Sequence, residues 1–184
     1  MESLYLVLAG LGVFLVIFAV LFNKLRVANI SVNEALAQID VQLKRRADLI
    51  PNLVETVKGY ASHESGTLTK VTEARSATMK ATTFDDKVSS DNMLTGALRG
   101  LLAISENYPD LKASANFLAL QEELSTTENK IAFARQYYND SVLVANSLVT
   151  TIPTNMFAGV AGVKLRDFYA VENEADRKLP DVKF

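Results

Sequence analysis

The sequence predicts an all-α protein, an elongated antiparallel bundle of about four helices that continues from an N-terminal transmembrane helix. Three observations support this prediction. The chain opens with an uncharged apolar run, apolar residues beyond it recur at spacings of three and four, and no stretch alternates like a strand for more than a few residues. Hydrophobic residues make up 49% of the 184 residues, so the remainder can bury a core.

The apolar run, residues 4–22, is predicted to be an uncleaved membrane anchor. Its 19 residues form a helix just long enough to cross a hydrocarbon core of about 30 Å. A cleaved signal peptide is the alternative, but the run is preceded by Glu2 rather than by a cation, and no small-residue cleavage motif follows it. Lys24 and Arg26 lie directly after the run. We therefore expect a single-pass protein of the bacterial inner membrane with its N-terminus outside and its bundle in the cytoplasm.

The first soluble helix is expected to continue directly from the anchor, because nothing between Asn23 and Ile30 breaks it. The alternative is a separate start at residues 31–34, Ser-Val-Asn-Glu, which have capping-box spacing. Pro51 is expected to kink or end this helix, since proline lacks the amide donor and clashes with the preceding turn. The apolar positions of the helix lie three or four residues apart: Val32, Leu36, Ile39, Leu43, Ala47 and Ile50.

Two helices and a loop are predicted beyond Pro51. The first helix covers about residues 52–81. Residues 82–90 are rich in Asp, Ser and Thr and indicate a loop. Ser90 or Asp91 would then cap the next helix, over about residues 92–107.

The longest soluble helix is expected over residues 114–151, after a turn at Tyr108-Pro109-Asp110. It would measure about 55 Å and pair antiparallel with the first helices at a crossing angle of about 20°. Its apolar stripe is continuous only if Thr127 and Ala134 fill two turns. The stripe comprises Phe117, Leu120, Leu124, Ile131, Tyr138, Val142, Ala145 and Leu148.

The predicted organisation has three parts. Residues 1–23 form the anchor, residues 24–165 the cytoplasmic helical bundle, and residues 166–184 a mixed-charge tail, which we expect to be loose from Glu172 to Phe184. An uncharged apolar stretch, residues 156–163, comes after Pro153 near the end of the bundle.

Three blocks of the chain resemble one bacterial family. They are residues 38–60 (QIDVQLKRRADLIPNLVETVKGY), residues 108–112 (YPDLK) and residues 117–139 (FLALQEELSTTENKIAFARQYYN). The blocks resemble the opening and middle segments of the LemA family, and the likeness covers nearly the whole chain. One departure is Ile152 before Pro153, where the family usually has Phe.

The resemblance implies a single-pass protein with a helical bundle that faces the cytoplasm. It brings no agreed biochemical activity. Genes of the family often lie near those of membrane zinc metallopeptidases, so the resemblance leaves a second role open, that of an adaptor or regulator of a membrane protease or of another envelope-stress component.

The residues do not indicate an enzyme or a cofactor. The chain has no cysteine and one histidine, His63, which we interpret as a surface helix residue rather than a metal ligand. Asp85, Asp86 and Asp91 lack the ligand series of a calcium loop and are interpreted as turn and cap residues. The net charge of −2 gives no reason to expect a nucleic-acid partner.

Polar and apolar residues near the end of the chain form the candidate interaction surface. Glu128 and Arg135 lie seven residues apart beside Tyr138, so they share one helix face. They are interpreted either as a polar seam for a partner or, preferably, as interhelical ion pairs with charges such as Asp40, Arg45, Arg46 and Asp48. The other candidates are Met156, Phe157, Val160 and Val163, which could equally pack on the bundle or contact membrane or another subunit.

We interpret the protein as a membrane-anchored, non-enzymatic scaffold. The expected partners are the lipid bilayer, further copies of the chain, and a membrane protein whose identity the sequence does not give. Ala9, Gly10 and Gly12 offer a small-residue patch in the anchor, without true G-x-x-x-G spacing.

Overall fold

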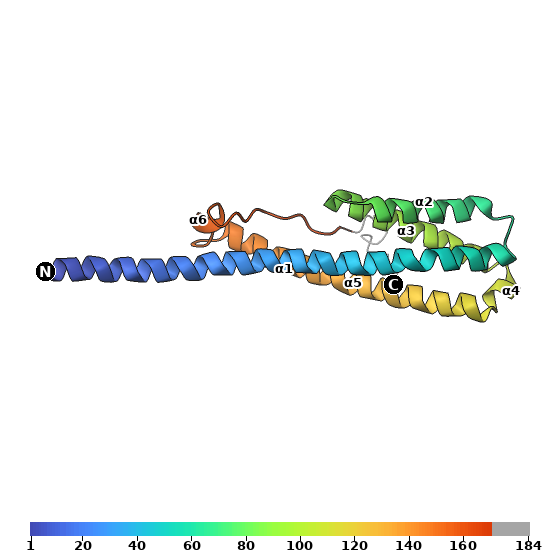
Figure 1. Cartoon of the computed structure of the whole chain (residues 1–184), viewed down its shortest axis with the longest axis horizontal. Helices are drawn as coiled ribbons and strands as arrows, with labels where there is room; N and C mark the ends of the chain where they lie inside the picture. Colours follow the sequence, from blue (N-terminus) through green and yellow to red (C-terminus); the bar gives the residue numbers. More distant parts are fainter. Residues whose placement is uncertain (171–184) are drawn as a thin grey trace, which may run out of the picture. The chain divides into compact units, whose positions relative to one another are not determined.

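A computed structural model describes residues 1–170 of the chain (Figure 1). The described residues form helices and connecting segments, with no strand among them, so the predicted all-α fold is confirmed. The six helices are α1 (Glu2–Tyr60), α2 (Ser65–Lys80), α3 (Phe84–Ser105), α4 (Pro109–Lys112), α5 (Ala115–Thr150) and α6 (Asn155–Ala158).

The chain divides into two compact units, and α1 and α5 contribute to both. The first unit contains Met1–Ile39 and Phe133–Phe168, and the second contains Asp40–Ala132 and the chain from Tyr169 onward. The predicted three-part organisation stays a prediction. The expected loose tail from Glu172 lies outside the described residues.

Helix α1 continues without a break through Ser31. Direct continuation from the apolar run is therefore confirmed, and a separate helix start at Ser31 is wrong. Most large side chains of the run are exposed, whereas Phe18, Leu21 and Phe22 at its end are half-buried. Within residues 1–170, α1 is the one helix that is long and apolar enough to cross a membrane.

Pro51 was expected to kink or end the first helix. It does not end the helix, because α1 continues to Tyr60, and the kink stays a prediction. A proline inside a helix leaves the carbonyl four residues earlier without its usual amide donor. Here that carbonyl belongs to Ala47, and it accepts a hydrogen bond of 2.9 Å from Nε of Arg75 on α2. The orphaned acceptor is therefore satisfied by a side chain from a neighbouring helix. Ile50 and Leu53 on either side of the proline are buried and hold the helix in place.

The single helix expected over residues 52–81 is also wrong. The chain leaves α1 after Tyr60, reverses direction, and resumes as α2 at Ser65. The reversal brings Leu68 of α2 into the same core as Val57 and Ala61. His63 lies exposed in this connection rather than in a helix.

Helix α3 begins earlier than expected, so most of the predicted loop at residues 82–90 is helical. Its N-cap is Thr83 rather than Ser90 or Asp91. The Thr83 hydroxyl accepts a bond of 3.1 Å from the Asp86 amide, and the Asp86 carboxylate accepts one of 3.4 Å from the Thr83 amide. This reciprocal capping box has aspartate at its fourth position, whereas Glu or Gln is the usual signal.

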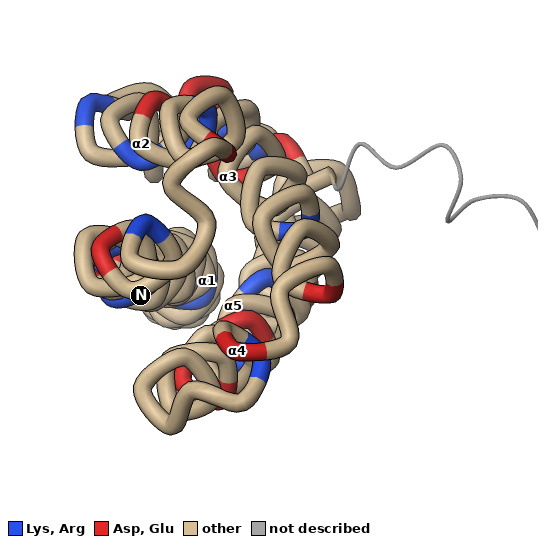
Figure 2. The backbone as a smooth tube through the Cα atoms, turned by 90° about the vertical axis from the view of Figure 1, so that its right-hand side faces the viewer, with Lys and Arg blue, Asp and Glu red and all other residues tan. Residues whose placement is uncertain are grey.

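The core of the second unit consists of aliphatic side chains from α1, α2 and α3, together with Leu111 of α4 and residues of α5. Helices α2 and α3 lie side by side in both views (Figures 1 and 2). Burying these side chains provides the main driving force for folding of the unit. The buried set is Ile50, Leu53, Val57, Ala61, Leu68, Val71, Ala74, Leu94, Leu98, Leu101, Leu111, Phe117 and Leu124.

Helix α5 matches its predicted bounds to within one residue at each end. The small residues Thr127 and Ala134 are buried, as the continuous stripe requires. Thr127 avoids an unsatisfied hydroxyl by donating to the carbonyl of Glu123 at 2.8 Å.

Candidate interaction site

The second unit contains a buried guanidinium between three helices. Arg46 of α1 is only 1% exposed. Its Nη1 donates to Oε2 of Glu128 on α5 at 2.6 Å and to Oγ1 of Thr95 on α3 at 3.0 Å. Its Nη2 donates to the carboxylate of Asp91 and to the backbone carbonyl of the same residue at 3.3 Å. One side chain therefore ties α1 to both α3 and α5.

The carboxylate of Asp91 is fully buried and has a second donor. The hydroxyl of Tyr169 donates to Oδ2 of Asp91 at 2.7 Å. The Tyr169 ring in turn contacts the ring of Phe84 edge-on, with 5.7 Å between the centroids. Asp91 is therefore neither a cap nor a turn residue. We call Arg46, Asp91, Thr95, Glu128 and Tyr169 the arginine cluster.

Spacing in the sequence explains how the helices build this cluster. Asp91 and Thr95 are four residues apart on α3, so both face Arg46. Arg46 is paired with the fully buried carboxylate of Asp91 and with the half-exposed carboxylate of Glu128. One positive and two negative charges leave the arginine cluster with one surplus negative charge near its exposed side. Such buried pairs add little net stability, but they fix which helix faces meet. The geometry supports a structural role for Arg46.

A pocket of about 330 Å³ opens beside the arginine cluster, between α3 and α5. Arg46, Arg99 and Glu128 supply its charges, and Leu98, Leu102 and Leu124 supply apolar walls. Its volume is at the lower limit of about 300 Å³ for ligand sites. Among residues 1–170 no group of three or more His, Cys, Asp or Glu side chains is placed to hold a metal ion.

The predicted polar seam is divided between the two units. Glu128 belongs to the second unit and is bound to Arg46. Arg135 belongs to the first unit, where it is half-buried on α5. Further ion pairs join Asp40 to Lys87 at 2.7 Å and Arg45 to Glu123 at 3.0 Å. These contacts favour the interpretation as ion pairs between helices, while partner binding by the seam stays a prediction.

The candidate Tyr138 is buried in the first unit and is only 3% exposed. Its hydroxyl donates to the carbonyl of Asp167 at 3.0 Å. Burial raises the pKa of this hydroxyl, with a smaller opposite effect from Arg166. Tyr138 therefore holds the extended segment after residue 163 against α5.

Asn146 holds the same extended segment one residue earlier. Its Nδ2 donates to the carbonyl of Arg166, and its Oδ1 accepts from the amide of Arg166, both at 2.9 Å. The Arg166 guanidinium donates to Oδ1 of Asn29 and of Asn33 on α1, at 3.0 and 3.1 Å. The sequence did not reveal this role of Asn146, because one asparagine on a helix carries no recognisable pattern.

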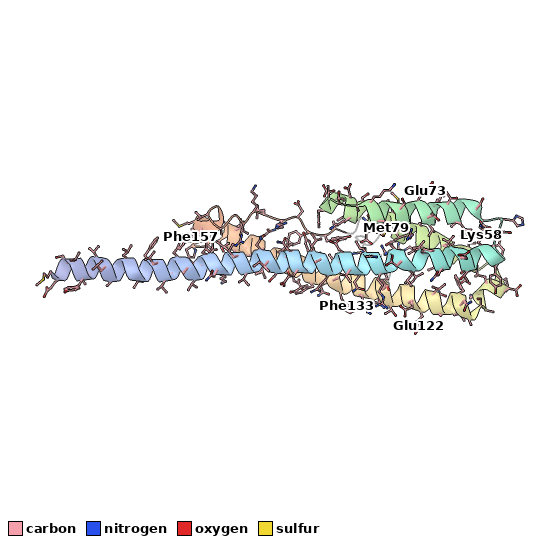
Figure 3. The ribbon with its side chains drawn as sticks, in the orientation of Figure 1. Lys58, Glu73, Met79, Glu122, Phe133 and Phe157 are labelled. Carbon is pink, nitrogen blue, oxygen red and sulfur yellow. The ribbon has the colours of Figure 1, made fainter. Side chains whose placement is uncertain are left out.

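The four apolar candidates after α5 divide into an inner and an outer set. Val163 is buried, and the half-buried Phe157 contacts the ring of Phe18 edge-on at 5.4 Å (Figure 3). Met156 and Val160 are 73% and 71% exposed. The structure therefore leaves Met156 and Val160 as surface residues, whereas Val163 packs inside the first unit.

Sequence reasoning missed an exposed apolar stripe on α5. Phe133, Tyr137 and Val144 are 72%, 45% and 56% exposed (Figure 3 labels Phe133). Their spacing of four and seven residues places them on one helix face. That spacing was visible in the sequence, but the neighbouring stripe that contains Ile131 and Tyr138 has the same period, and only the structure shows which one is buried. We call Phe133, Tyr137 and Val144 the α5 stripe.

Comparison with known proteins agrees with the family resemblance seen in the sequence. The family model of the LemA family matches residues 35–184. Protein LemA of Metamycoplasma hominis is 31% identical over 152 residues, which cover 80% of this chain and 68% of that protein. The magnetosome proteins MamQ 1 and MamQ 2 of Paramagnetospirillum magneticum are each 22% identical over 166 residues, covering 76% of this chain and 61% of theirs. The chain belongs to the LemA family.

Proposed function

We propose that the protein is a non-enzymatic scaffold, anchored by α1 in the bacterial inner membrane, that associates with further copies of itself through the α5 stripe. The observation that carries the proposal is the exposure of the α5 stripe. Three large apolar side chains on one face of a helix are unusual on a surface with no partner.

The continuous helix α1 supports the choice of a second copy as the partner. Chains that are anchored in one membrane are confined to two dimensions and share an orientation. This confinement raises their effective concentration, so that a small apolar contact is sufficient for association. The α5 stripe lies on one helix, and the same stripe on a second copy offers a self-complementary surface.

The cations after the apolar run support a cytoplasmic bundle. Lys24 and Arg26 follow residue 22 on α1, whereas no Lys or Arg precedes the run. Retention of such residues on the cytoplasmic side sets the orientation of single-pass proteins. We expect a reporter enzyme fused after Phe184 to lie in the cytoplasm. Reporter activity on the outer side of the inner membrane would contradict this orientation.

The arginine cluster supports a non-enzymatic role. The carboxylates of Asp91 and Glu128 are both bound to Arg46, so neither is placed as a general base beside a nucleophile. The neighbouring pocket would still be the first place to test for ligand binding.

The decisive experiment measures the size of the full chain in detergent and compares two variants. Phe133→Ser with Val144→Ser removes most of the α5 stripe. Leu118→Ser is the matched control, because Leu118 is 50% exposed on the same helix but lies in the second unit. We expect an oligomer for the wild-type chain and the control, and a monomer for the stripe variant.

A photoactivatable crosslinker at position 133 identifies the partner in cells. Self-crosslinks support the proposal. A monomeric wild-type chain, or repeated capture of one other membrane protein without self-crosslinks, would contradict self-association and favour the adaptor role that the family resemblance left open.

A further inference from the structure

The segment that follows α5 in the first unit lies beside the end of the apolar run. The Phe157 ring contacts Phe18 with centroids 5.4 Å apart, and Phe18 stacks on Phe22 at 5.9 Å. Arg26 lies about two turns after Phe18 on α1. Its Nη1 donates to the carbonyl of Ala161 at 3.4 Å. The segment therefore extends along α1 from inside the uncharged run to the first cations after it.

The same segment has an inner and an outer face. Ala158, Ala161 and Val163 are buried. The outer face presents Ile152, Met156 and Val160, which are 81%, 73% and 71% exposed. No charged residue occurs between Asp140 and Lys164, so the outer face is uncharged, and Asn155 is an exposed polar residue of the segment.

The backbone of the segment is largely satisfied from within. The amides of Phe157, Ala161 and Val163 donate to carbonyls of the same segment at 2.9–3.0 Å. Gly162, with φ of +67°, supplies the left-handed turn that brings the Val163 amide back to the carbonyl of Ala158. Internal pairing of this kind lowers the cost of moving a backbone out of water.

Cations flank the segment at its charged end. Lys164 and Arg166 follow it, and Lys24 and Arg26 follow the apolar run on α1. The contact between Arg26 and Ala161 places these two groups of cations near each other within the first unit. Cations at this level meet lipid phosphates, and each contributes about 1 kcal/mol of attraction to an anionic membrane surface.

We propose that residues 152–163 form a second membrane contact, which inserts Ile152, Met156 and Val160 at the boundary between headgroups and acyl chains of an anionic bilayer. We call these residues the interfacial segment. Short apolar elements with adjoining cations bind membranes in this manner. The proposal rests on the membrane anchor of the proposed function, and it assigns a lipid surface rather than a protein to the outer face.

The absence of natural cysteine makes a direct depth measurement feasible. Single cysteines replace Met156 or Val160 in the full chain and carry an environment-sensitive fluorophore. Phe14→Cys reports on the anchor. Leu143→Cys is the matched control, because Leu143 is a 57% exposed apolar residue of the first unit that lies outside both the interfacial segment and the α5 stripe. The labelled chains are reconstituted into vesicles of phosphatidylcholine and phosphatidylglycerol that contain nitroxide lipids.

We expect lipids labelled near the headgroup to quench positions 156 and 160 several-fold more than position 143, and deep nitroxides to quench position 14. Quenching of positions 156 and 160 by aqueous iodide instead would overturn the proposal in favour of a solvated surface. Protection from both quenchers would overturn it in favour of a protein occupant, such as a second copy. If deep nitroxides do not quench position 14, the result would overturn the membrane anchor. It would also overturn the membrane contact of the interfacial segment, which depends on the anchor.

A paired substitution tests the apolar contact independently of the label. Ile152→Ser with Val160→Ser should decrease headgroup-level quenching at position 156, while quenching at position 14 is retained. Far-ultraviolet circular dichroism checks that the helices are intact. Unchanged quenching at position 156 in a folded variant would contradict the assigned contact.

Discussion

Arg46 of the second unit differs in its partners from Arg26 and Arg166 of the first unit. Arg46 is bound to the carboxylates of Asp91 and Glu128. Arg26 donates to a backbone carbonyl, and Arg166 donates to two asparagine side chains. Two of the four contacts of Arg46 are therefore made to charged oxygens, whereas these contacts of Arg26 and Arg166 are made to neutral ones.

The difference shows that the two kinds of arginine contact have different consequences. A carboxylate neutralises an arginine and fixes helix register in a buried core. Next to a membrane surface, an arginine held by neutral oxygens keeps its net charge available for lipid phosphates.

The largest effect is expected from Arg46→Met. Loss of the guanidinium leaves the Asp91 carboxylate buried without its charge partner, which should lower the free energy of unfolding by about 3–5 kcal/mol. Arg45→Met is the matched control, since its pair with Glu123 is exposed and contributes at most about 1 kcal/mol. Urea denaturation of the full chain in detergent measures both. Equal effects for the two variants would remove the distinction between the buried and the exposed ion pair.

Combining Arg46→Met with Asp91→Leu sharpens the same test. The second change removes the unpaired buried charge, so much of the lost stability should return. An equally unstable double variant would show instead that Asp91 has a further essential contact, for which Tyr169 is the first candidate.

Asn146→Leu is expected to cost about 2 kcal/mol, because two hydrogen bonds to the backbone of Arg166 are lost. The local readout is hydrogen exchange of the Arg166 amide, which should lose protection. Ser147→Ala, on the exposed neighbouring position, is the control. Undiminished protection of the Arg166 amide would show that neutral contacts do not hold this segment.

Arg75→Met should cost about 1 kcal/mol, because the Ala47 carbonyl loses its donor. The cost should nearly vanish in a Pro51→Ala background, where the amide of residue 51 can form the normal helical bond. A double-mutant cycle by urea denaturation measures this coupling. Independent effects of the two changes would refute the compensation.

The smallest effect concerns alkaline pH. Burial raises the pKa of Tyr138 above its usual value of 10.0, so the folded state favours the neutral phenol. Its contribution to stability is intact below pH 10 and is lost as the pH rises through the folded-state pKa. Tyr138→Phe should remove this part of the alkaline loss and about 1 kcal/mol of hydrogen bonding, whereas Tyr137→Phe should change neither. Identical alkaline unfolding profiles for all three chains would contradict the assignment.

Local signals made several features predictable from the sequence. The all-α fold, the continuous α1 and the bounds of α5 were all predictable. The signals were the helical period, the uncharged run and the blocks shared with the LemA family. Each of these signals depends on residues that lie close together in the chain. The continuation of α1 past Pro51 and the Thr83 cap were missed for different reasons. The former depends on a donor from α2, which is distant in the chain, and the latter on an aspartate that replaces the usual glutamate in a capping box.

The residues of the candidate surface were identifiable from the sequence, but their exposure was not. It determined that residues 141–163 are uncharged and that the α5 residues repeat at helical spacing, because composition and period are local properties. Only the tertiary structure decided that Tyr138 and Val163 are buried while Phe133, Met156 and Val160 are exposed. Two stripes of equal period on one helix differ only in what packs against them, and that depends on residues distant in the chain.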